Sequence, residues 1–169
     1  MRRTRFDDWP CPIARTTDLV ADWWTPLVMR EAFSGATRFD EFQRRLDVPR
    51  SVLTSRLRRL TDEGLLLRVE YQAHPPRHEY RLTQKGREFY GVLAAMWRWG
   101  SDWLWDDGAG EPPVMLVDRD TGRRVEPIVV DQATGEPIDV RRLRLTAAQP
   151  SPVATGRSVS VDQPDHEPT

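Results

Sequence analysis

The sequence predicts a mainly α-helical fold with one small β-hairpin, an α+β arrangement. Apolar residues recur at helical spacing in several segments before about residue 105, and two short strand-like runs flank Pro75-Pro76. The tryptophans and most of the leucine, phenylalanine and methionine residues also precede that point. Because 169 residues suit one ordinary domain with an appendage, we expect a main domain over 1–106, a short β-rich extension over 107–145 and a disordered tail over 146–169.

The first two predicted helices lie near the N-terminus. Apolar spacing predicts a helix over 12–23, with positions on one face at Ile13, Thr17, Val20 and Trp24. Thr25-Pro26 is a helix-start signal and Gly35 a suitable terminator, so a second helix is expected over 26–34.

The next two helices are short and close together. A third helix is expected around residues that repeat at i, i+3 and i+7, namely Phe39, Phe42 and Leu46. Asp47-Val48-Pro49 then makes a tight turn, and a fourth helix follows over 50–63 with an inward stripe of Leu53, Leu57 and Leu60 before Gly64. Two short helices joined by a tight turn form a helix-turn-helix arrangement.

Beyond Gly64, the strand-like runs 65–71 and 77–82 predict a hairpin with a proline-containing tip. Thr83 then caps a long helix that we expect to reach about Trp105. This helix carries one apolar stripe with heptad spacing, Phe89, Leu93, Met96, Gly100 and Trp103, and a second stripe beside it, Tyr90, Trp97 and Leu104. Two apolar faces require two neighbours, so the helix is expected to pack on its own domain and to form the interface of a homodimer.

The composition changes after Asp106 to glycine, proline and acidic residues, with strand-like pieces at 114–117, 125–130 and 138–145. A short repeat occurs here: Val117-Asp118-Arg119-Asp120-Thr121-Gly122 returns thirteen residues later as Val130-Asp131-Gln132-Ala133-Thr134-Gly135. Each copy ends in a Thr-Gly turn signal.

Charge is distributed unevenly. The net charge is −1, but residues 38–87 carry 12 basic against 7 acidic residues, and 24 of all 25 basic residues are arginine. Arginine is the better planar donor to phosphate and guanine, so this basic segment favours a nucleic-acid partner. No apolar run approaches the roughly 20 residues of a membrane helix, and the single Cys11 excludes a disulfide framework or a multi-cysteine zinc site. We therefore expect a cytoplasmic protein with no membrane association, metal or cofactor.

Short strings spread in order over residues 10 to 105 carry a family resemblance. They are Cys11-Pro12-Ile13-Ala14-Arg15, Trp24-Thr25-Pro26-Leu27, Arg30-Glu31, Arg38-Phe39-Asp40-Glu41-Phe42, Leu53-Thr54-Ser55-Arg56-Leu57, Leu60, Glu63-Gly64-Leu65, Arg68, Pro75-Pro76-Arg77-His78-Glu79-Tyr80 and Leu82-Thr83-Gln84-Lys85-Gly86-Arg87. On these residues the chain resembles the HxlR-type regulators, a branch of the MarR-like winged-helix proteins. The resemblance implies a winged helix-turn-helix transcriptional regulator that binds double-stranded operator DNA as a homodimer, expected here to act as a repressor. The repeat at Asp118 and Asp131 is similar to a zinc-ribbon-like extension of some relatives, with the cysteines absent.

In a helix-turn-helix, the second helix enters the major groove. On a helical projection with the leucines inward, the residues expected to contact bases are Arg50, Ser51, Thr54, Ser55 and Arg58. Arg56 and Arg59 are expected at phosphates, Arg77 at a neighbouring minor groove, and His78, with His74, at phosphates. The absence of acids between Arg50 and Thr61 favours this interpretation over a solvated surface helix. For the two histidines, an exposed position without a role stays open.

Cys11 and the tryptophans each allow two interpretations. Cys11 precedes a helix start, which favours a thiolate, so it is either a sensor of oxidants or electrophiles, as the resemblance implies for some members, or an inert buried residue. The tryptophans of the long helix, with Trp23 and Trp24, either fill a core or line a pocket for a small-molecule effector. No spacing brings a nucleophile to a base, so we expect no enzyme. The competing function is a winged-helix module that contacts proteins without specific DNA binding.

Overall fold

The protein is described by a computed structural model that covers residues 6, 8–20, 22–105 and 110–146. The chain divides into two compact units, with the boundary between Val129 and Val130. Every α-helix and strand described belongs to the first unit, and the short 3₁₀ turn η2 (Val140–Arg142) belongs to the second. The tail predicted over 146–169 lies, apart from Thr146, outside the described residues.

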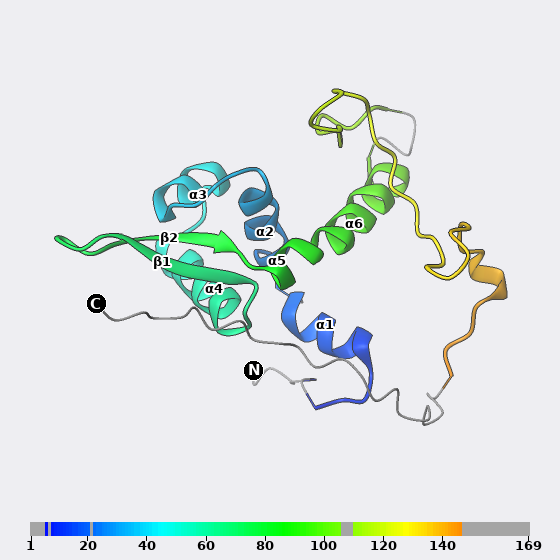
Figure 1. Ribbon diagram of the computed structural model, residues 1–169, viewed down its shortest axis with the longest axis horizontal. Helices are drawn as coiled ribbons and strands as arrows, with labels where there is room; N and C mark the ends of the chain where they lie inside the picture. Colours follow the sequence, from blue (N-terminus) through cyan, green and yellow to red (C-terminus); the bar gives the residue numbers. More distant parts are fainter. Residues whose placement is uncertain (1–5, 7, 21, 106–109, 147–169) are drawn as a thin grey trace, which may run out of the picture. The chain divides into compact units, whose positions relative to one another are not determined.

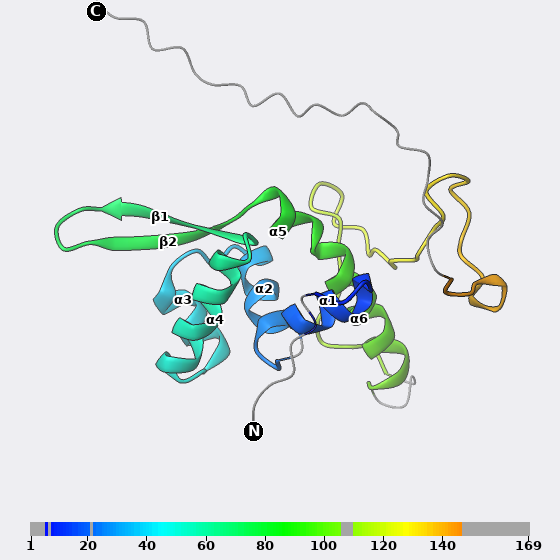
Figure 2. The same cartoon turned by 90° about the horizontal axis from the view of Figure 1, so that it is seen from below.

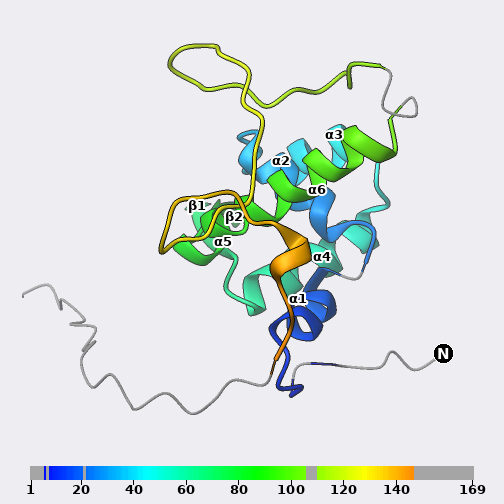
Figure 3. The ribbon, with the colours of Figure 1, turned by 90° about the vertical axis from the view of Figure 1, so that its right-hand side faces the viewer.

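The first unit confirms the expected α+β fold class. Its elements follow in the order α1 (Pro12–Val20), α2 (Thr25–Phe33), α3 (Phe39–Leu46), α4 (Arg50–Asp62), β1 (Leu66–Gln72), β2 (Arg77–Leu82), α5 (Gln84–Glu88) and α6 (Tyr90–Trp103). Figure 1 shows α2, α3 and α4 grouped beside the hairpin, with α6 extending away from them. Figure 3 shows α6 next to α2, which it contacts.

The helix-turn-helix pair is α3 and α4, and its core is the predicted leucine stripe. Leu53, Leu57 and Leu60 are each 0% exposed and pack with Phe42 and Met29 in one apolar cluster. Full burial of each such side chain contributes about 1.5–3 kcal/mol. Because these leucines face the core, the residues on the other side of α4 face outward.

A carboxylate organises the start of α3. Glu41 Oε2 accepts hydrogen bonds from the backbone N–H groups of Thr37 at 2.8 Å and Arg38 at 3.0 Å. These bonds, that of Arg38 first, lower the pKa of Glu41. At the other end of α3, Asp47 adopts a φ of 48°, which turns the chain into α4.

The hairpin forms the wing. β1 and β2 pair antiparallel from Leu66 opposite Leu82 to Gln72 opposite Arg77. In Figures 1 and 2 the tip extends past α3 and α4. The other end is tied to the helices, because the Tyr80 N–H donates to the Thr37 carbonyl at 2.7 Å.

Thr83 caps the helix after the wing, as predicted. Its Oγ1 accepts from the Gly86 N–H at 3.0 Å and donates to the Gly64 carbonyl at 2.7 Å. A Cβ atom at position 86 would lie 2.1 Å from the Leu65 carbonyl oxygen, so glycine is required there. This close approach fixes the wing against the helix that follows it.

Two helix boundaries differ from the prediction. The first helix ends at Val20 and not near residue 23, because the Asp22 carboxylate accepts the backbone N–H groups of Trp24 and Thr25 and starts α2 there. The long helix is interrupted at Phe89, which is only 8% exposed and joins the core. Bonds from the Phe89 N–H to Gly86 and from the Val92 N–H to Phe89 tighten the backbone at this point.

The extension contains turns where strands were expected. Among its described residues, β structure is limited to two isolated bridges, Val117 with Arg124 and Val130 with Pro137. Both repeats close with a bond from the glycine N–H to the aspartate carbonyl, from Gly122 to Asp118 at 2.9 Å and from Gly135 to Asp131 at 2.7 Å. In the first copy, hydrogen bonds from the Thr121 hydroxyl and N–H lower the pKa of Asp118. Side-chain and backbone hydrogen bonds thus shape these turns.

No helix in the described part of the chain combines the length and apolar character needed to cross a membrane.

Candidate nucleic-acid interface

The outward face of α4 consists of small polar and cationic side chains. The residues predicted to contact bases are all exposed, namely Arg50, Ser51, Thr54, Ser55 and Arg58. The Arg50 guanidinium lies 4.6 Å from the centre of the Phe39 ring, a cation–π contact that orients it at the N-terminal end of the helix. Arg58 Nε is 3.7 Å from Asp62, in a pair whose side chains are 81% and 67% exposed. Solvent weakens such a pair, so Arg58 remains available to a partner.

The other two arginines of α4 have partners inside the domain. Arg56 Nε lies 2.9 Å from Asp22 Oδ1, and Arg59 Nη2 donates to the Asp18 carbonyl at 2.6 Å and to its carboxylate at 3.1 Å. The side chains of Arg56 and Arg59 are only 24% and 21% exposed. This placement differs from the phosphate contacts expected from the sequence, because the carboxylates come from α1 and the α1–α2 turn. The two ion pairs fix α4 against the N-terminal helices.

Asp22 joins this anchor to the start of α2. Besides the Arg56 pair, its carboxylate accepts two backbone N–H groups and the Thr25 hydroxyl, the last at 2.5 Å. We expect Asp22→Ala to lower the free energy of unfolding by about 1–2 kcal/mol, because a helix cap is lost and Arg56 loses its partner. The exposed Asp62→Ala is the control and should change stability by less than about 0.5 kcal/mol. Urea denaturation of both variants measures this difference, and equal effects would contradict the anchoring role.

The wing presents one exposed cation and one half-buried histidine from the predicted set. Arg77 is exposed at the start of β2, whereas the His78 side chain is 24% exposed. His78 Nδ1 lies 3.0 Å from Arg68 Nη2, and its Nε2 lies 3.8 Å from Glu70. Because arginine only donates, Nδ1 accepts this bond. His74 is exposed at the tip.

Two arginines near the wing, Arg38 and Arg68, were not predicted from the sequence to contact DNA. Arg38 lies over the Tyr71 ring at 4.7 Å, and Arg68 contacts His78 from the neighbouring strand. For Arg68, the signal that could have been used is strand pairing. The register places Arg68 opposite Tyr80, two residues from His78 on the neighbouring strand. Arg38, Arg68 and Arg77 are all exposed, so the hairpin and its surroundings carry cations in addition to those of α4.

Cys11 lies at the start of α1 and is half-buried. Arg15, one helical turn along the chain from Cys11, directs its Nε to the Trp9 carbonyl at 2.7 Å. The two open interpretations of Cys11, sensor or inert residue, are therefore not separated by this contact.

The apolar stripe on α6 is rotated from the predicted one. Of the five residues expected at a dimer interface, Phe89 lies in the core, Leu93 and Gly100 are half-buried, and Met96 and Trp103 are exposed. The exposed apolar residues of α6 at helical spacing are Val92, Met96, Trp99 and Trp103, at 36%, 48%, 58% and 69% exposure. We call this set the α6 stripe. The interpretation that the tryptophans fill the core of the domain is wrong for Trp99 and Trp103, which are exposed. It is also wrong for Trp23 and Trp105, which are 89% and 42% exposed.

The first unit thus combines a helix-turn-helix, a wing and a long apolar helix, and sequence comparison agrees with this geometry. The profile of the HxlR-like helix-turn-helix proteins matches residues 19–107. The chain belongs to the HxlR-like helix-turn-helix family. The matched region contains α2 to α6 and begins after Cys11, and the described part of the extension, 110–146, follows it. The HxlR-type resemblance found in the sequence is thus confirmed, and the protein is a transcriptional regulator of the winged helix-turn-helix type.

Relatives and solved structures fit this assignment. The helix-turn-helix transcriptional regulator Rv3095 of Mycobacterium tuberculosis is 38% identical over 131 residues, which cover 78% of this chain and 82% of Rv3095. The regulator sll1512 of Synechocystis is 44% identical over 95 residues, 56% of this chain and 70% of the relative. The crystal structure of PA1607, assigned as a transcription factor, superposes with a TM-score of 0.76 at 36% identity and covers 86% of this chain and all of PA1607. The reduced form of the redox regulator HypR superposes with a TM-score of 0.52 at 29% identity, over 57% of this chain and 99% of HypR.

Proposed function

We propose that this HxlR-like protein is a sequence-specific, homodimeric repressor, with α4 in the major groove and the wing at the adjacent minor groove. The observation that supports it best is the division of α4 into two faces. Its outer face is exposed and contains arginines and hydroxyls, whereas its inner arginines are held by Asp18 and Asp22. A fixed helix with free donors on one side suits direct contact with base edges.

In this arrangement the predicted contacts are divided by position. Arg50, Ser51, Thr54, Ser55 and Arg58 contact bases or the adjoining phosphates, Arg77 enters the minor groove, and His78 lies beside the phosphates. The Thr54 hydroxyl donates to the Arg50 carbonyl at 2.8 Å, so toward DNA it offers its oxygen as an acceptor and its methyl group. Arg56 and Arg59 act mainly by positioning α4.

A salt titration of DNA binding tests this function against a protein-interaction module. With a fragment that contains the promoter of its own gene, a dimer that neutralises about 6–10 phosphates should show a log–log slope of affinity on salt near −5 to −9. Random DNA of equal length is the control and should bind more weakly. Equal binding to both fragments would favour the interaction module, and a reporter fused to the promoter distinguishes repression from activation.

The α6 stripe supports the dimer. It places two tryptophans, a methionine and a valine in solvent on one face of a helix, and the opposite side of α6 contacts α2. Isolated exposed apolar residues are ordinary, but a continuous row of large ones indicates a contact surface. Pairing with a second copy would align two α4 helices about one DNA turn, roughly 34 Å, apart.

Control by oxidation is a further part of the proposal, because HypR, a redox regulator solved in reduced and oxidised forms, superposes on this chain. Cys11 is the only cysteine, so oxidation gives either a Cys11–Cys11 bridge between subunits or a mixed disulfide with a small thiol. In the bridge, two thiols lose two protons and two electrons to the oxidant.

We expect treatment with diamide to change operator affinity about 5- to 150-fold, the usual range of coupling between two sites. Intact mass identifies the product, and fluorescence anisotropy measures binding before and after a reductant is added. Cys11→Ser is the control and should not respond. Modified Cys11 with unaltered DNA binding would remove the thiol from the function.

A further inference from the structure

The buried side chain of helix α1 is a carboxylate. Among the described residues of this helix only Asp18 is buried, at 5% exposure, whereas Leu19 and Val20 are half-buried against the apolar cluster. A buried carboxylate lowers stability unless a cation or hydrogen-bond donors face it. The partner of Asp18 therefore indicates what the docking of α1 stabilises.

That partner is Arg59, near the end of α4. One nitrogen, Nη2, donates to the Asp18 carbonyl at 2.6 Å and to Oδ2 of its carboxylate at 3.1 Å. The carbonyl belongs to the last turn of α1, where backbone acceptors lack a helical donor and a cation interacts favourably with the helix dipole. Arg59 thus closes the C-terminal end of α1 and joins it to a helix 41 positions further along the chain.

A second ion pair acts on the same side of α4. Arg56 precedes Arg59 by three residues, so both side chains leave the helix on one side. Arg56 Nε lies 2.9 Å from Oδ1 of Asp22. The side chains of Asp18 and Asp22 are only 7% and 11% exposed, so solvent screens these pairs less than pairs on the surface. Two points about 4.5 Å apart along α4 are therefore held by groups outside the helix-turn-helix.

These two contacts restrict a motion that the leucine core opposes less sharply. Apolar packing is non-directional, whereas a hydrogen bond weakens as soon as its distance and angle change. A rotation of α4 by about 20° about its axis would move a side chain on its outer face, about 5 Å from the axis, by about 2 Å. Contacts with base edges require donor–acceptor distances of about 2.7–3.2 Å, so this shift would break them, while a long side chain can still follow a phosphate.

We propose that Asp18 and Asp22 determine operator specificity as positioning residues, so that the docking of α1 regulates DNA recognition by α4. This inference rests on the proposed role of α4 in the major groove. Both carboxylates act through Arg59 and Arg56, and neither needs to touch DNA. A protein with α1 undocked keeps its exposed cations and still binds DNA, but it loses its preference for the operator.

The same ion pairs allow an opposite role, in which the carboxylates mask two arginines from phosphates. Loss of such a mask would strengthen binding to any DNA, and each additional phosphate contact would steepen the log–log dependence of affinity on salt by about 0.9. Positioning predicts an unchanged slope and weaker binding to the operator alone. The bond to the Asp18 carbonyl favours positioning, because it keeps Arg59 near α1 even when the carboxylate is removed.

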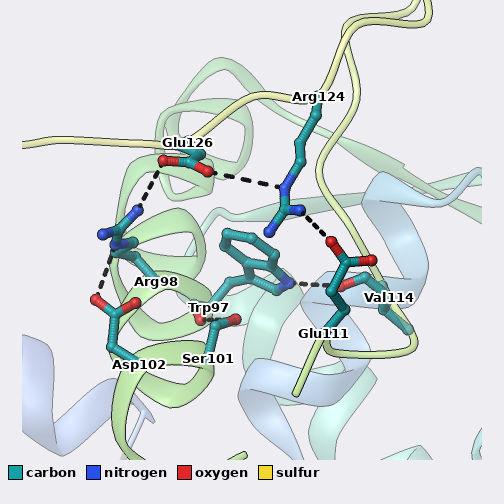
Figure 4. Close-up of polar contacts among 8 residues, drawn as sticks. All are labelled: Trp97, Arg98, Ser101, Asp102, Glu111, Val114, Arg124 and Glu126. Carbon is teal, nitrogen blue, oxygen red and sulfur yellow. Dashed lines mark hydrogen bonds and ion pairs between the residues drawn. The ribbon is translucent and has the colours of Figure 1, made fainter. Parts of the chain in front are cut away.

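Fluorescence anisotropy of the full chain on the promoter fragment and on random DNA, each over a range of salt concentrations, tests the proposal. We expect Asp18→Ala to bind the promoter fragment at least about tenfold more weakly, as for one weakened base contact, and to keep its affinity for random DNA and its salt slope. Asp18→Asn keeps an oxygen acceptor for Arg59 and should recover most of the preference. The control is Glu111→Ala, which breaks an exposed pair with Arg124 at 3.0 Å, shown in Figure 4, and should change neither affinity.

Arg59→Lys tests the pair from the side of α4. Lysine keeps the charge that a phosphate contact needs but lacks the planar fork of donors. Positioning therefore predicts a loss of operator preference, whereas a direct phosphate contact predicts none. Thermal denaturation shows whether each variant is folded at the temperature of the assay. If Asp18→Ala is unfolded there, Asp18→Asn and Arg59→Lys decide the question.

The unmodified protein separates this inference from the proposed function. Equal binding of the unmodified protein to both fragments would contradict the proposed function and this inference with it. A preference in the unmodified protein that Asp18→Ala and Arg59→Lys retain would overturn this inference alone. A steeper salt slope of Asp18→Ala, with tighter binding to random DNA, would overturn it in favour of masking.

Discussion

Replacing Arg50 by alanine is expected to weaken operator binding by at least about 30-fold, and Arg58→Ala by a similar amount. An arginine that contacts guanine contributes about 1–3 kcal/mol, and a homodimer loses that contact in both half-sites, so about 2–6 kcal/mol is at stake for each substitution. Neither change should unfold the protein, because both side chains are exposed and the core lies on the opposite face of α4.

The contact with Phe39 makes Arg50 the more informative position. Its guanidinium is already oriented over the ring, 4.6 Å from the centre, before DNA binds. Arg50→Lys keeps the charge but removes the planar pair of donors. We therefore expect Arg50→Lys to bind random DNA as the unmodified protein does, while it loses most of its preference for the operator.

Arg119→Ala is the matched control, because it removes an exposed arginine from the extension. It should leave the preference for operator over random DNA unchanged, as measured by fluorescence anisotropy at a fixed salt concentration. If Arg50→Ala and Arg58→Ala also retain that preference, α4 does not determine specificity.

Most of the fold could be predicted because its signals are local and repeated. Leu53, Leu57 and Leu60 lie one helical turn apart and are all completely buried, so the outward residues of α4 followed from the inward ones. The cap at Thr83 and the wing were predicted for the same reason, since turn and cap chemistry depends on neighbours in the chain.

The parts that could not be predicted depend on contacts between distant residues. The partners of Arg56 and Arg59, Asp22 and Asp18, lie in different elements, 34 and 41 positions away, and no periodicity indicates such ion pairs. The strand-like pieces of the extension pair only through isolated bridges on either side of turns and form no strand in the described residues. The hydropathy of these pieces indicates a local preference for extended backbone, but a strand forms only where a neighbouring segment pairs with it over several residues.

The predicted dimer stripe was wrong at Phe89 for a related reason. Heptad spacing identifies a face of an uninterrupted helix, but the backbone tightens at Phe89 and directs that ring into the core. The exposed row then begins at Val92 and includes Trp99, which the heptad pattern did not contain. The sequence indicated that α6 has an apolar face toward a partner, and the structure supplies the residues for testing it.

The double substitution Met96→Glu and Trp99→Glu is expected to convert the protein to monomers. Burial of each large apolar side chain contributes about 1.5–3 kcal/mol, and a dimer through the α6 stripe would bury both residues from both copies. The variant replaces these gains with four carboxylates that lose water and repel one another. Sedimentation should show the monomer under conditions in which the unmodified protein is a dimer.

Operator affinity should fall when dimerisation is lost, although the α6 stripe is separate from α4. A monomer binds one half-site only. It loses the high effective concentration at which the second subunit of a dimer meets the other half-site, and this high concentration raises the operator affinity of the dimer about 10²- to 10⁴-fold. Affinity for a single half-site should stay unchanged, and this separates loss of the dimer from loss of the fold. The control is Ile128→Glu with Val129→Glu, which adds the same charge at positions 65% and 64% exposed outside α6. An unmodified protein that sediments as a monomer, or a Met96→Glu, Trp99→Glu variant that still dimerises and binds the operator normally, would exclude α6 as the dimer interface.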